Sequence, residues 1–467
     1  MCAQRVGPGE ALSARRTLLR IWKRVVAALV IALTGACGSA PRPDIVLITL
    51  DTTRADRLGC YGYGGETTPN LDRFAKEAVV YTRAYSTTSW TFPAHASLFT
   101  GKFTASHGMR YDPEGSLSFT SAVPGPERWN KIRVHGLGQG ERTLAAILSE
   151  AGYSTGAVVA GPWLKRVMGL DDGFGHYDDD GIASINGRPA PQVTDRALAW
   201  IAENADPSLF LFLNYFDPHR PLKAHRKFIR ELPAGGGSKA PKDERSQLYD
   251  AEIRFMDHHL GRLFQGLRRL DRYERSWIIV TADHGELLGE HGLIGHGNTL
   301  HEEVVHVPLI VKYPSGESPT GTDDSEVQLV DVFATILDRL ELAVPPGVQG
   351  NPLNEVRHPV IAELFPLYFM RRALRKSTEE WRGDVRTLRR GDYKFVWSSL
   401  GRHQLFDLSA DPQESENLVE ERMDVAASMQ AELRDYLATL PKPGPDSAPR
   451  QVDPETEEAL RNLGYLE

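Results

Sequence analysis

Residues 44–51 read DIVLITLD, a run of apolar and β-branched side chains that ends in a carboxylate. Such an unbroken run is typical of a strand that is buried on both faces of a parallel sheet. Two later segments repeat the pattern: residues 209–215 (LFLFLNY) precede Asp217-Pro218-His219, and residues 276–281 (SWIIVT) precede Asp283-His284. Because open α/β sheets bind their ligands at the carboxyl ends of the strands, the three runs predict acids and histidines gathered at one edge of a sheet.

Helical and strand patterns alternate along the rest of the chain, as in α/β folds. We expect helices at 143–151, 249–270 and about 423–440, strands at 308–312, 360–365 and 393–397, surface loops at 112–141 and 233–242, and a linker at 345–352. The predicted fold is therefore a large, mostly parallel sheet flanked by helices in a catalytic domain over residues 44–350. A small C-terminal α+β subdomain is predicted over residues 351–467.

The chain begins with the features of an export signal. Residues 1–36 contain six arginine or lysine residues and one glutamate, and they end in the apolar run Val25–Ala36. This run is too short to cross a bilayer comfortably, and a basic head before a short apolar run is typical of a secretory signal. We predict a signal peptide over residues 1–37, lipidation at Cys37, a spacer at 38–43, and export to the periplasm or cell surface. Simple cleavage and a retained anchor are the alternatives.

The formal net charge of −8 includes this basic leader, so the rest of the chain is more acidic than the whole. An acidic body argues against a nucleic-acid partner, because phosphate backbones attract basic surfaces. The cysteines are Cys2, Cys37 and Cys60, and two of them belong to the leader, which leaves no pair for a disulfide in the mature body. We expect Cys60 to be a small buried residue. No pattern indicates an oligomeric state.

Three segments connect these patterns to a known family. Asp51–Gly62 (DTTRADRLGCYG), Thr91–Gly101 (TFPAHASLFTG) and Thr281–Gly292 (TADHGELLGEHG) resemble motifs of the sulfatase branch of the alkaline phosphatase superfamily. Thr91 stands at the first position of the C-x-P-x-R signature, where sulfatases carry the cysteine that becomes formylglycine, and His95 stands at the arginine. The resemblance implies the alkaline phosphatase/sulfatase fold and hydrolysis of anionic esters.

The resemblance also implies a metal site formed by Asp51, Thr91, Asp283 and His284. Hard oxygens and an imidazole suit a metal that activates a hydroxyl group, and coordination lowers the pKa of that hydroxyl. Thr52 replaces the second acid of calcium-type sulfatases, and His284 stands where many of them have an amide. Fewer carboxylates and one imidazole favour Zn²⁺ or Mn²⁺ over Ca²⁺.

Two further histidines, His219 and His296, correspond to positions that contact the transferred anion and the leaving group in sulfatases. In one interpretation His219 contacts the anion and His296 is the general acid for the departing alkoxide. In the other, Asp217, His219 and His296 bind a second metal. Arg54 and His95 are candidates for further contacts to the anion, to which the N-terminus of a helix would add dipole stabilisation.

A threonine at position 91 changes the reaction that the resemblance implies. Formylglycine cannot form from threonine, so a threonine ester must be cleaved by attack on its bonded anion, which favours a phosphate mono- or diester over a sulfate ester. Resolution by water gives a hydrolase, which we favour, and resolution by an alcohol gives an envelope phosphoethanolamine or phosphoglycerol transferase. A non-catalytic binding protein is the third alternative. The expected partner is an anionic ester of a glycan or lipid in the envelope or outside the cell. The protein itself is expected to contact the membrane if its lipid anchor forms.

Overall fold

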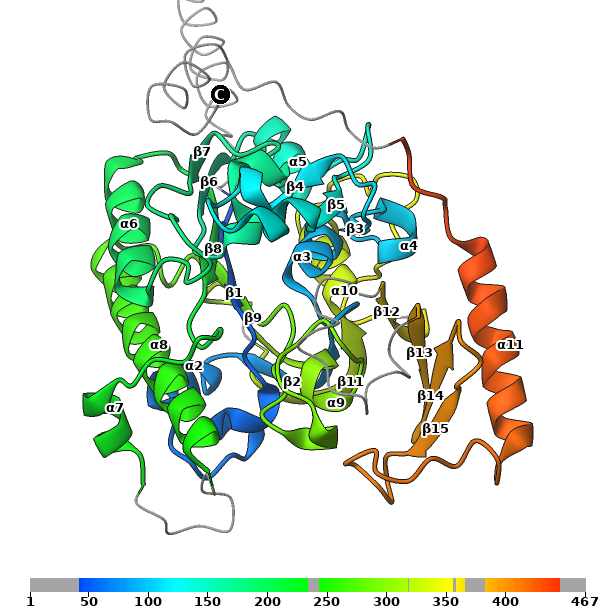
Figure 1. The fold of residues 1–467 in the computed structure, drawn as a ribbon. Coiled ribbons are helices and arrows are strands. Elements are labelled where there is room, and N and C mark those ends of the chain that lie inside the picture. Colours follow the sequence, from blue (N-terminus) through cyan, green and yellow to red (C-terminus); the bar gives the residue numbers. More distant parts are fainter. Residues whose placement is uncertain (1–41, 234–242, 318, 356–357, 366–382, 446–467) are drawn as a thin grey trace, which may run out of the picture. The chain divides into compact units, whose positions relative to one another are not determined.

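The computed structural model describes residues 42–233, 243–317, 319–355, 358–365 and 383–445 (Figure 1). All three apolar runs form strands with the predicted bounds: β1 (Asp44–Leu50), β8 (Leu209–Tyr215) and β9 (Ser276–Thr281). Every residue of these strands is buried. β1 lies between β8 and β9 and is parallel to both, so the carboxyl ends of the three strands meet at one edge of the sheet.

The central sheet has eight strands in the order β11-β2-β10-β9-β1-β8-β6-β7. Five of the seven neighbouring pairs are parallel, and β10 is antiparallel to both of its neighbours. The prediction of a large, mostly parallel sheet is thus confirmed. The remaining strands are β2 (Val79–Tyr85), β6 (Ser154–Val158), β7 (His176–Asp178), β10 (His306–Lys312) and β11 (Gly321–Gln328).

Helices cover both faces of this sheet (Figure 1). One layer consists of α2 (Pro69–Ala75), α6 (Ala190–Glu203) and α8 (Glu244–Arg269), and the other of α3 (Thr91–Thr100), α5 (Leu144–Glu150) and α10 (Leu329–Arg339). The side chain of Thr143 caps α5 by accepting a hydrogen bond from Ala146 N at 3.0 Å. Asp243 caps α8 in the same way, through Ser246 N at 2.9 Å, which is why this helix begins five residues before the expected start at residue 249.

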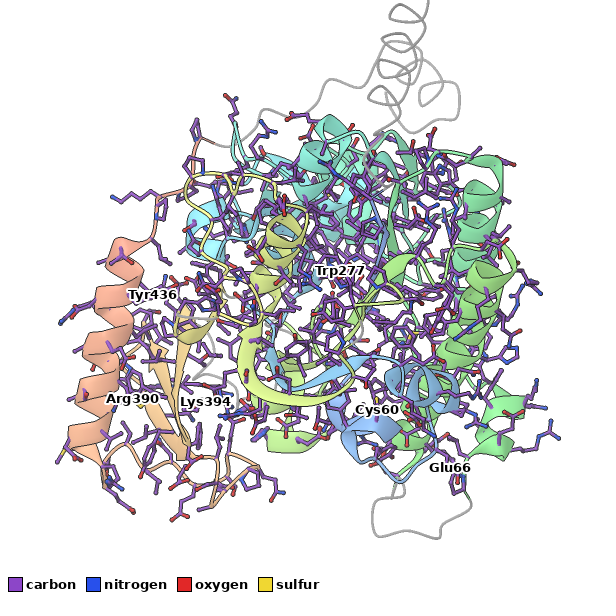
Figure 2. All side chains as sticks on the ribbon, turned by 180° about the vertical axis from the view of Figure 1, so that it is seen from behind. Cys60, Glu66, Trp277, Arg390, Lys394 and Tyr436 are labelled. Atoms are coloured by element: carbon purple, nitrogen blue, oxygen red, sulfur yellow. The ribbon has the colours of Figure 1, made fainter. Side chains whose placement is uncertain are left out.

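A second, antiparallel sheet lies in the C-terminal part of the chain. Its strands are β12 (Val360–Leu364), β13 (Val385–Arg390), β14 (Tyr393–Ser398) and β15 (Gln404–Asp407), and α11 (Met423–Thr439) packs on β13 and β14. The buried Lys394, labelled in Figure 2, donates to Leu300 O at 2.7 Å and pairs with Glu302 at 2.9 Å. This sheet is therefore joined to the segment that precedes β10. The predicted C-terminal α+β region is confirmed, while a boundary at residue 350 stays a prediction.

The remaining described elements are short. They are η1 (Ala55–Arg57), η2 (Gly59–Tyr61), α4 (Thr104–His107), β3 (Arg110–Tyr111), β4 (Leu117–Ser118), η3 (Phe119–Ser121), η4 (Glu127–Lys131), β5 (Arg133–His135), η5 (Pro162–Leu164), η6 (Arg166–Met168), α7 (Arg226–Glu231), η7 (Glu290–Gly292) and α9 (Glu302–Val305). The stretch 112–141, expected to be a loop, thus contributes strands to a small three-stranded sheet. Cys60 is half-buried, and burial raises the pKa of its thiol to about 12 (Figure 2).

The predicted signal peptide, Cys37 and residues 38–41 of the spacer lie outside the described residues, as does most of the expected loop at 233–242. Within the described part of the chain, no helix has both the length and the apolar character needed to cross a bilayer.

Candidate active site

Three predicted ligands come together at the carboxyl edge of the central sheet. Thr49 on β1 is paired with Thr281 on β9, so Asp51 and Asp283, each two residues further on, leave the sheet at the same level. The ligand atoms of Asp51, Asp283 and His284 all lie within 4.8 Å of one another. All three side chains are buried, and this shields the cluster from water.

The two carboxylates of this cluster have oxygens that no described donor satisfies. Asp51 is fully buried, and neither of its oxygens has a hydrogen-bond partner among the described residues. One oxygen of Asp283 accepts from Thr52 N at 3.3 Å and from His284 N at 3.0 Å, but the other has no such partner. Burial raises the pKa of both groups, and their mutual repulsion adds to the effect at Asp51. Buried carboxylates of this kind require a cation or a proton, so the site fits a divalent metal.

Thr91 and His284 complete the cluster. Thr91 is the first residue of α3, and its Oγ1 lies 3.1 Å from Nε2 of His284. Nδ1 of His284 donates to Gly285 O at 2.9 Å, so Nε2 presents its lone pair to Thr91. Burial lowers the pKa of His284 to about 3, which keeps the ring neutral, as a metal ligand must be. The helix N-terminus adds a positive partial charge beside the hydroxyl.

His95, predicted to contact the anion, has a different position. Its Nδ1 donates to Thr91 O at 2.8 Å, and its Nε2 accepts from Thr49 Oγ1 at 3.0 Å. The ring is fully buried and both nitrogens have partners. His95 therefore ties the first turn of α3 to β1, and its Nδ1 also lies 3.7 Å from Oδ2 of Asp283.

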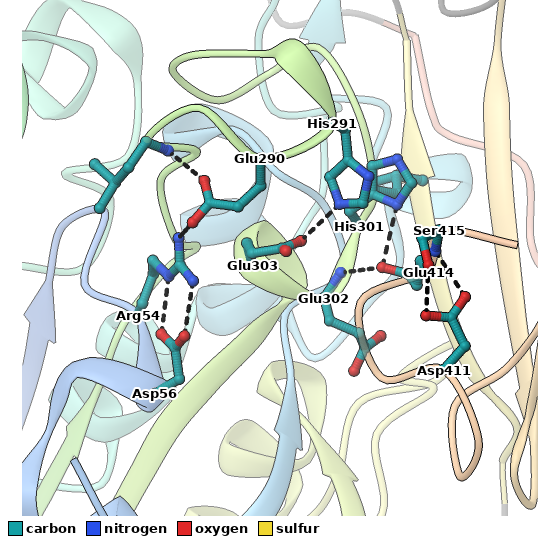
Figure 3. A network of polar contacts seen from close by, with 12 residues as sticks. Arg54, Asp56, Glu290, His291, His301, Glu302, Glu303, Asp411, Glu414 and Ser415 are labelled. Atoms are coloured by element: carbon teal, nitrogen blue, oxygen red, sulfur yellow. Dashed lines mark hydrogen bonds and ion pairs between the residues drawn. The ribbon is translucent and has the colours of Figure 1, made fainter. Parts of the chain in front are cut away.

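Arg54 also differs from the expectation of a substrate clamp. Its guanidinium binds both oxygens of Asp56, at 2.8 and 2.7 Å, and one oxygen of Glu290 at 2.7 Å (Figure 3). A further N–H reaches Glu286 O at 3.2 Å. Because two carboxylates balance its charge and hydrogen bonds occupy four of its five N–H donors, Arg54 organises the loops around the site.

His219 and His296 do lie together, next to the cluster of candidate metal ligands formed by Asp51, Asp283 and His284. The ring centroids of His296 and His284 are 4.5 Å apart, and those of His296 and His219 are 5.0 Å apart. Nδ1 of His219 donates to Arg220 O at 2.6 Å, so its Nε2 is the free nitrogen. Both histidines thus lie beside the cluster without belonging to it, and the roles that the sequence suggests for them stay predictions.

Asp217 does not join His219 and His296 as a second set of metal ligands. It is buried, and it accepts a hydrogen bond from Ala190 N at 2.8 Å. One of its oxygens instead lies within 4.8 Å of an oxygen of Glu252 and of a nitrogen of His225. Asp217 is therefore not available as the carboxylate ligand of a second metal beside His219 and His296. The chain turns after β8 and directs Asp217 toward the start of α6.

Sequence reasoning missed Glu286. This residue is fully buried, and its Oε2 accepts from Nδ1 of His296 at 2.6 Å. The available signal was its position two residues after His284, close to the end of the same strand.

A further cluster, formed by His291, His301 and Glu414, was also missed (Figure 3). The two rings of that cluster are stacked at 3.6 Å, and Glu414 pairs with Lys394 at 2.8 Å, so its charges are balanced without a metal.

A cleft of about 910 Å³ is lined in part by Arg220, the residue that follows His219 in the chain. Its walls combine apolar and charged side chains, including Arg220, Leu222, Leu288, Glu290 and Ile294. Arg220 connects the cleft to the site, because its Nε lies 3.8 Å from Oε1 of Glu286.

Comparison with known proteins shows the family and the fold of this chain. The profile of a family described as Sulfatase matches residues 43–342, and one described as N-sulphoglucosamine sulphohydrolase, C-terminal, matches residues 289–442. The chain is 24% identical to the uncharacterized sulfatase YidJ of Escherichia coli over 476 residues, which cover 86% of this chain and 88% of that protein. It is 23% identical to an N-acetylglucosamine-6-O-sulfatase of Bacteroides thetaiotaomicron over 490 residues, covering 81% and 82%. Among solved structures, a phosphonate monoester hydrolase of Agrobacterium radiobacter is similar with a TM-score of 0.64 and 19% identity, covering 85% of this chain and 96% of that one.

Proposed function

Because the chain belongs to the sulfatase family of hydrolases, we propose that it cleaves anionic esters with Thr91 as the nucleophile and a divalent metal as cofactor. The observation that carries this proposal is the contact between Thr91 Oγ1 and His284 Nε2 beside the unsatisfied oxygens of Asp51 and Asp283. A buried hydroxyl at a helix N-terminus, next to two carboxylates and a neutral imidazole, is suited to activation by a metal.

Asp51, Asp283 and His284 would hold the ion, together with Thr91. When bound, the ion lowers the pKa of the Thr91 hydroxyl and balances negative charge on the ester. Two carboxylates and one imidazole favour Zn²⁺ or Mn²⁺ over Ca²⁺. Thr52 supports this preference, because it stands where a calcium-type site has another acid. It contributes a backbone N–H to Asp283.

The remaining chemistry falls to residues of the chain. Thr91 Oγ1 attacks the phosphorus or sulfur atom, the bond to the alcohol oxygen breaks, and a threonyl ester forms on Thr91. His219 faces the transferred group, and His296 carries a proton to the departing oxygen. Water then cleaves the threonyl ester and restores the hydroxyl of Thr91.

We favour a phosphate mono- or diester as the substrate. A sulfatase releases sulfate through an aldehyde hydrate, which Thr91 cannot provide, so the anion must leave by direct attack of water. Similarity to a phosphonate monoester hydrolase is in line with this choice. The relative named N-acetylglucosamine-6-O-sulfatase supports a sugar as the alcohol portion, and the open cleft has room for one.

The decisive experiment compares purified protein loaded with Zn²⁺ or Mn²⁺ on nitrophenyl phosphate, a bis-nitrophenyl phosphate diester and nitrophenyl sulfate. We expect cleavage of a phosphate ester to exceed that of the sulfate by at least about tenfold. Dominant sulfate cleavage would instead show that a threonyl sulfate is resolved without an aldehyde, and the preference for phosphate would be wrong.

We also propose export and lipidation of Cys37, on the basis of the basic and apolar leader. The expected result is a mature protein that sediments with the membrane fraction and incorporates labelled palmitate. Cys37→Ala should remove the label and release active protein into the soluble fraction. Membrane association that persists without Cys37 would favour a retained anchor, and soluble wild-type protein would favour plain secretion.

A further inference from the structure

Glu286 is a buried charge that the proposed reaction does not yet use. It is fully buried, and its two oxygens have different surroundings. Oε2 accepts from Nδ1 of His296 at 2.6 Å, whereas Oε1 has no hydrogen-bond partner among the described residues. The guanidinium of Arg220 reaches only to 3.8 Å from Oε1. A buried carboxylate held mainly by one imidazole is costly unless that pairing serves a purpose.

The backbone fixes this pairing. Leu287 and Gly295 exchange two hydrogen bonds of 2.9 Å, Leu287 N to Gly295 O and Gly295 N to Leu287 O. The residues on either side of this bridge, Glu286 and His296, are thereby placed side by side. Gly295 has a φ of +93°, which favours glycine and closes the loop. Gly285 leaves no room for a side chain, because a Cβ there would lie 2.0 Å from Glu303 O.

The pairing decides which nitrogen of His296 is available. With Nδ1–H bound to Glu286, Nε2 is the free nitrogen, as it also is in His219. His296 is the imidazole next to His284, the residue whose Nε2 contacts the hydroxyl of Thr91. A carboxylate on the far nitrogen of an imidazole fixes its orientation and stabilises the ring when it becomes protonated.

We propose that Glu286 is a positioning residue that makes His296 the proton carrier of both half-reactions. In the first half-reaction, the proton of the Thr91 hydroxyl passes to Nε2 of His296 as the Thr91 oxygen bonds to the ester. The same proton then passes to the alcohol oxygen as its bond breaks. In the second, a proton of the attacking water passes to Nε2 and then to Oγ1 of Thr91 as the threonyl ester breaks. No other proton donor is required. The hydrogen bond from Nδ1–H of His296 to Glu286 is kept in both half-reactions. This inference rests on the proposed function.

The test uses the dependence of rate on the leaving group. Loss of a proton carrier harms esters of poor leaving groups far more than esters of good ones. We expect Glu286→Gln to lower kcat/KM by about 10²- to 10⁴-fold on phenyl phosphate and by less than about tenfold on 2,4-dinitrophenyl phosphate. If aryl sulfates are the better substrates, the matching sulfate pair is used. An equal loss on both esters would overturn the inference.

Glu303→Gln is the matched control, since the side chain of Glu303 also pairs with a histidine, His291, at 3.3 Å, and neither residue belongs to the cluster of Asp51, Asp283 and His284. It should leave the leaving-group dependence unchanged. Glu286→Gln should also retain the wild-type metal content. Loss of one equivalent of metal with a uniform drop in rate would overturn the inference and favour a metal-binding role for His296.

A second variant covers the case in which Glu286→Gln fails to fold. His296→Gln should show the same steep dependence on the leaving group, and the double variant should be no slower than His296→Gln alone. Additive losses would overturn the inference. Failure of the proposed function can be told apart from failure of this inference. In that case the Thr91→Ala variant would turn over the ester as fast as the wild-type protein does.

Discussion

Thr91→Ala should abolish turnover, with kcat/KM on the preferred nitrophenyl ester lowered by about 10³-fold or more. The reason is the loss of the atom that attacks the ester, since Oγ1 of Thr91 is the hydroxyl that contacts His284. The fold should survive, because the neighbouring contact from His95 is made to the backbone oxygen of Thr91. Steady-state kinetics together with circular dichroism and a metal analysis would check both expectations.

Thr100→Ala is the matched control for this variant. Thr100 is a buried threonine at the other end of the same helix, and its hydroxyl donates to Ala96 O at 2.7 Å. We expect activity close to wild type, since this hydroxyl satisfies only its own helix. Full activity in Thr91→Ala would remove threonine from the mechanism and leave water as the attacking group.

Asp51→Asn and Asp283→Asn should remove the bound metal and, with it, the activity. Each substitution replaces a charged ligand with a weaker neutral one in a site that has two carboxylates. The metal-free Asp51→Asn protein should unfold at a higher temperature than metal-free wild type, because a buried carboxylate without a partner destabilises the fold and a neutral amide relieves much of that cost. Metal content by mass spectrometry and thermal unfolding with and without Zn²⁺ would measure both effects.

Asp44→Asn provides the control for this experiment. Asp44 is a buried acid at the opposite end of the same strand, where it pairs with Arg272 at 3.2 Å and with Arg275 at 3.3 Å. Its substitution should lower the unfolding temperature and leave the metal content unchanged. Stoichiometric metal in both Asp51→Asn and Asp283→Asn would contradict the assignment of this cluster as the metal site.

The sequence by itself predicted four of the strands of the central sheet, β1, β8, β9 and β10, and the candidate metal ligands at its edge. Strand β1 is recognisable because every residue between Asp44 and Leu50 is buried, and burial on both faces produces an unbroken apolar run. Strands β8 and β9 are recognisable for the same reason. Asp51 follows the first of these runs directly, and Asp283 and His284 begin two residues after the last, so their convergence is a consequence of strand direction and of the position where each strand ends.

Only the tertiary structure decided which polar side chains are free. Arg54 is bound by Glu290, 236 residues away in the chain. Asp217 points away from His219 and His296 and binds the backbone of Ala190. Glu286 meets His296 because of a backbone bridge between Leu287 and Gly295. Residue type and local spacing predict what a side chain is able to bind. Its actual partner depends on the segments that folding brings together. Because a buried polar group without a partner is costly, the fold is selected in which such groups are paired.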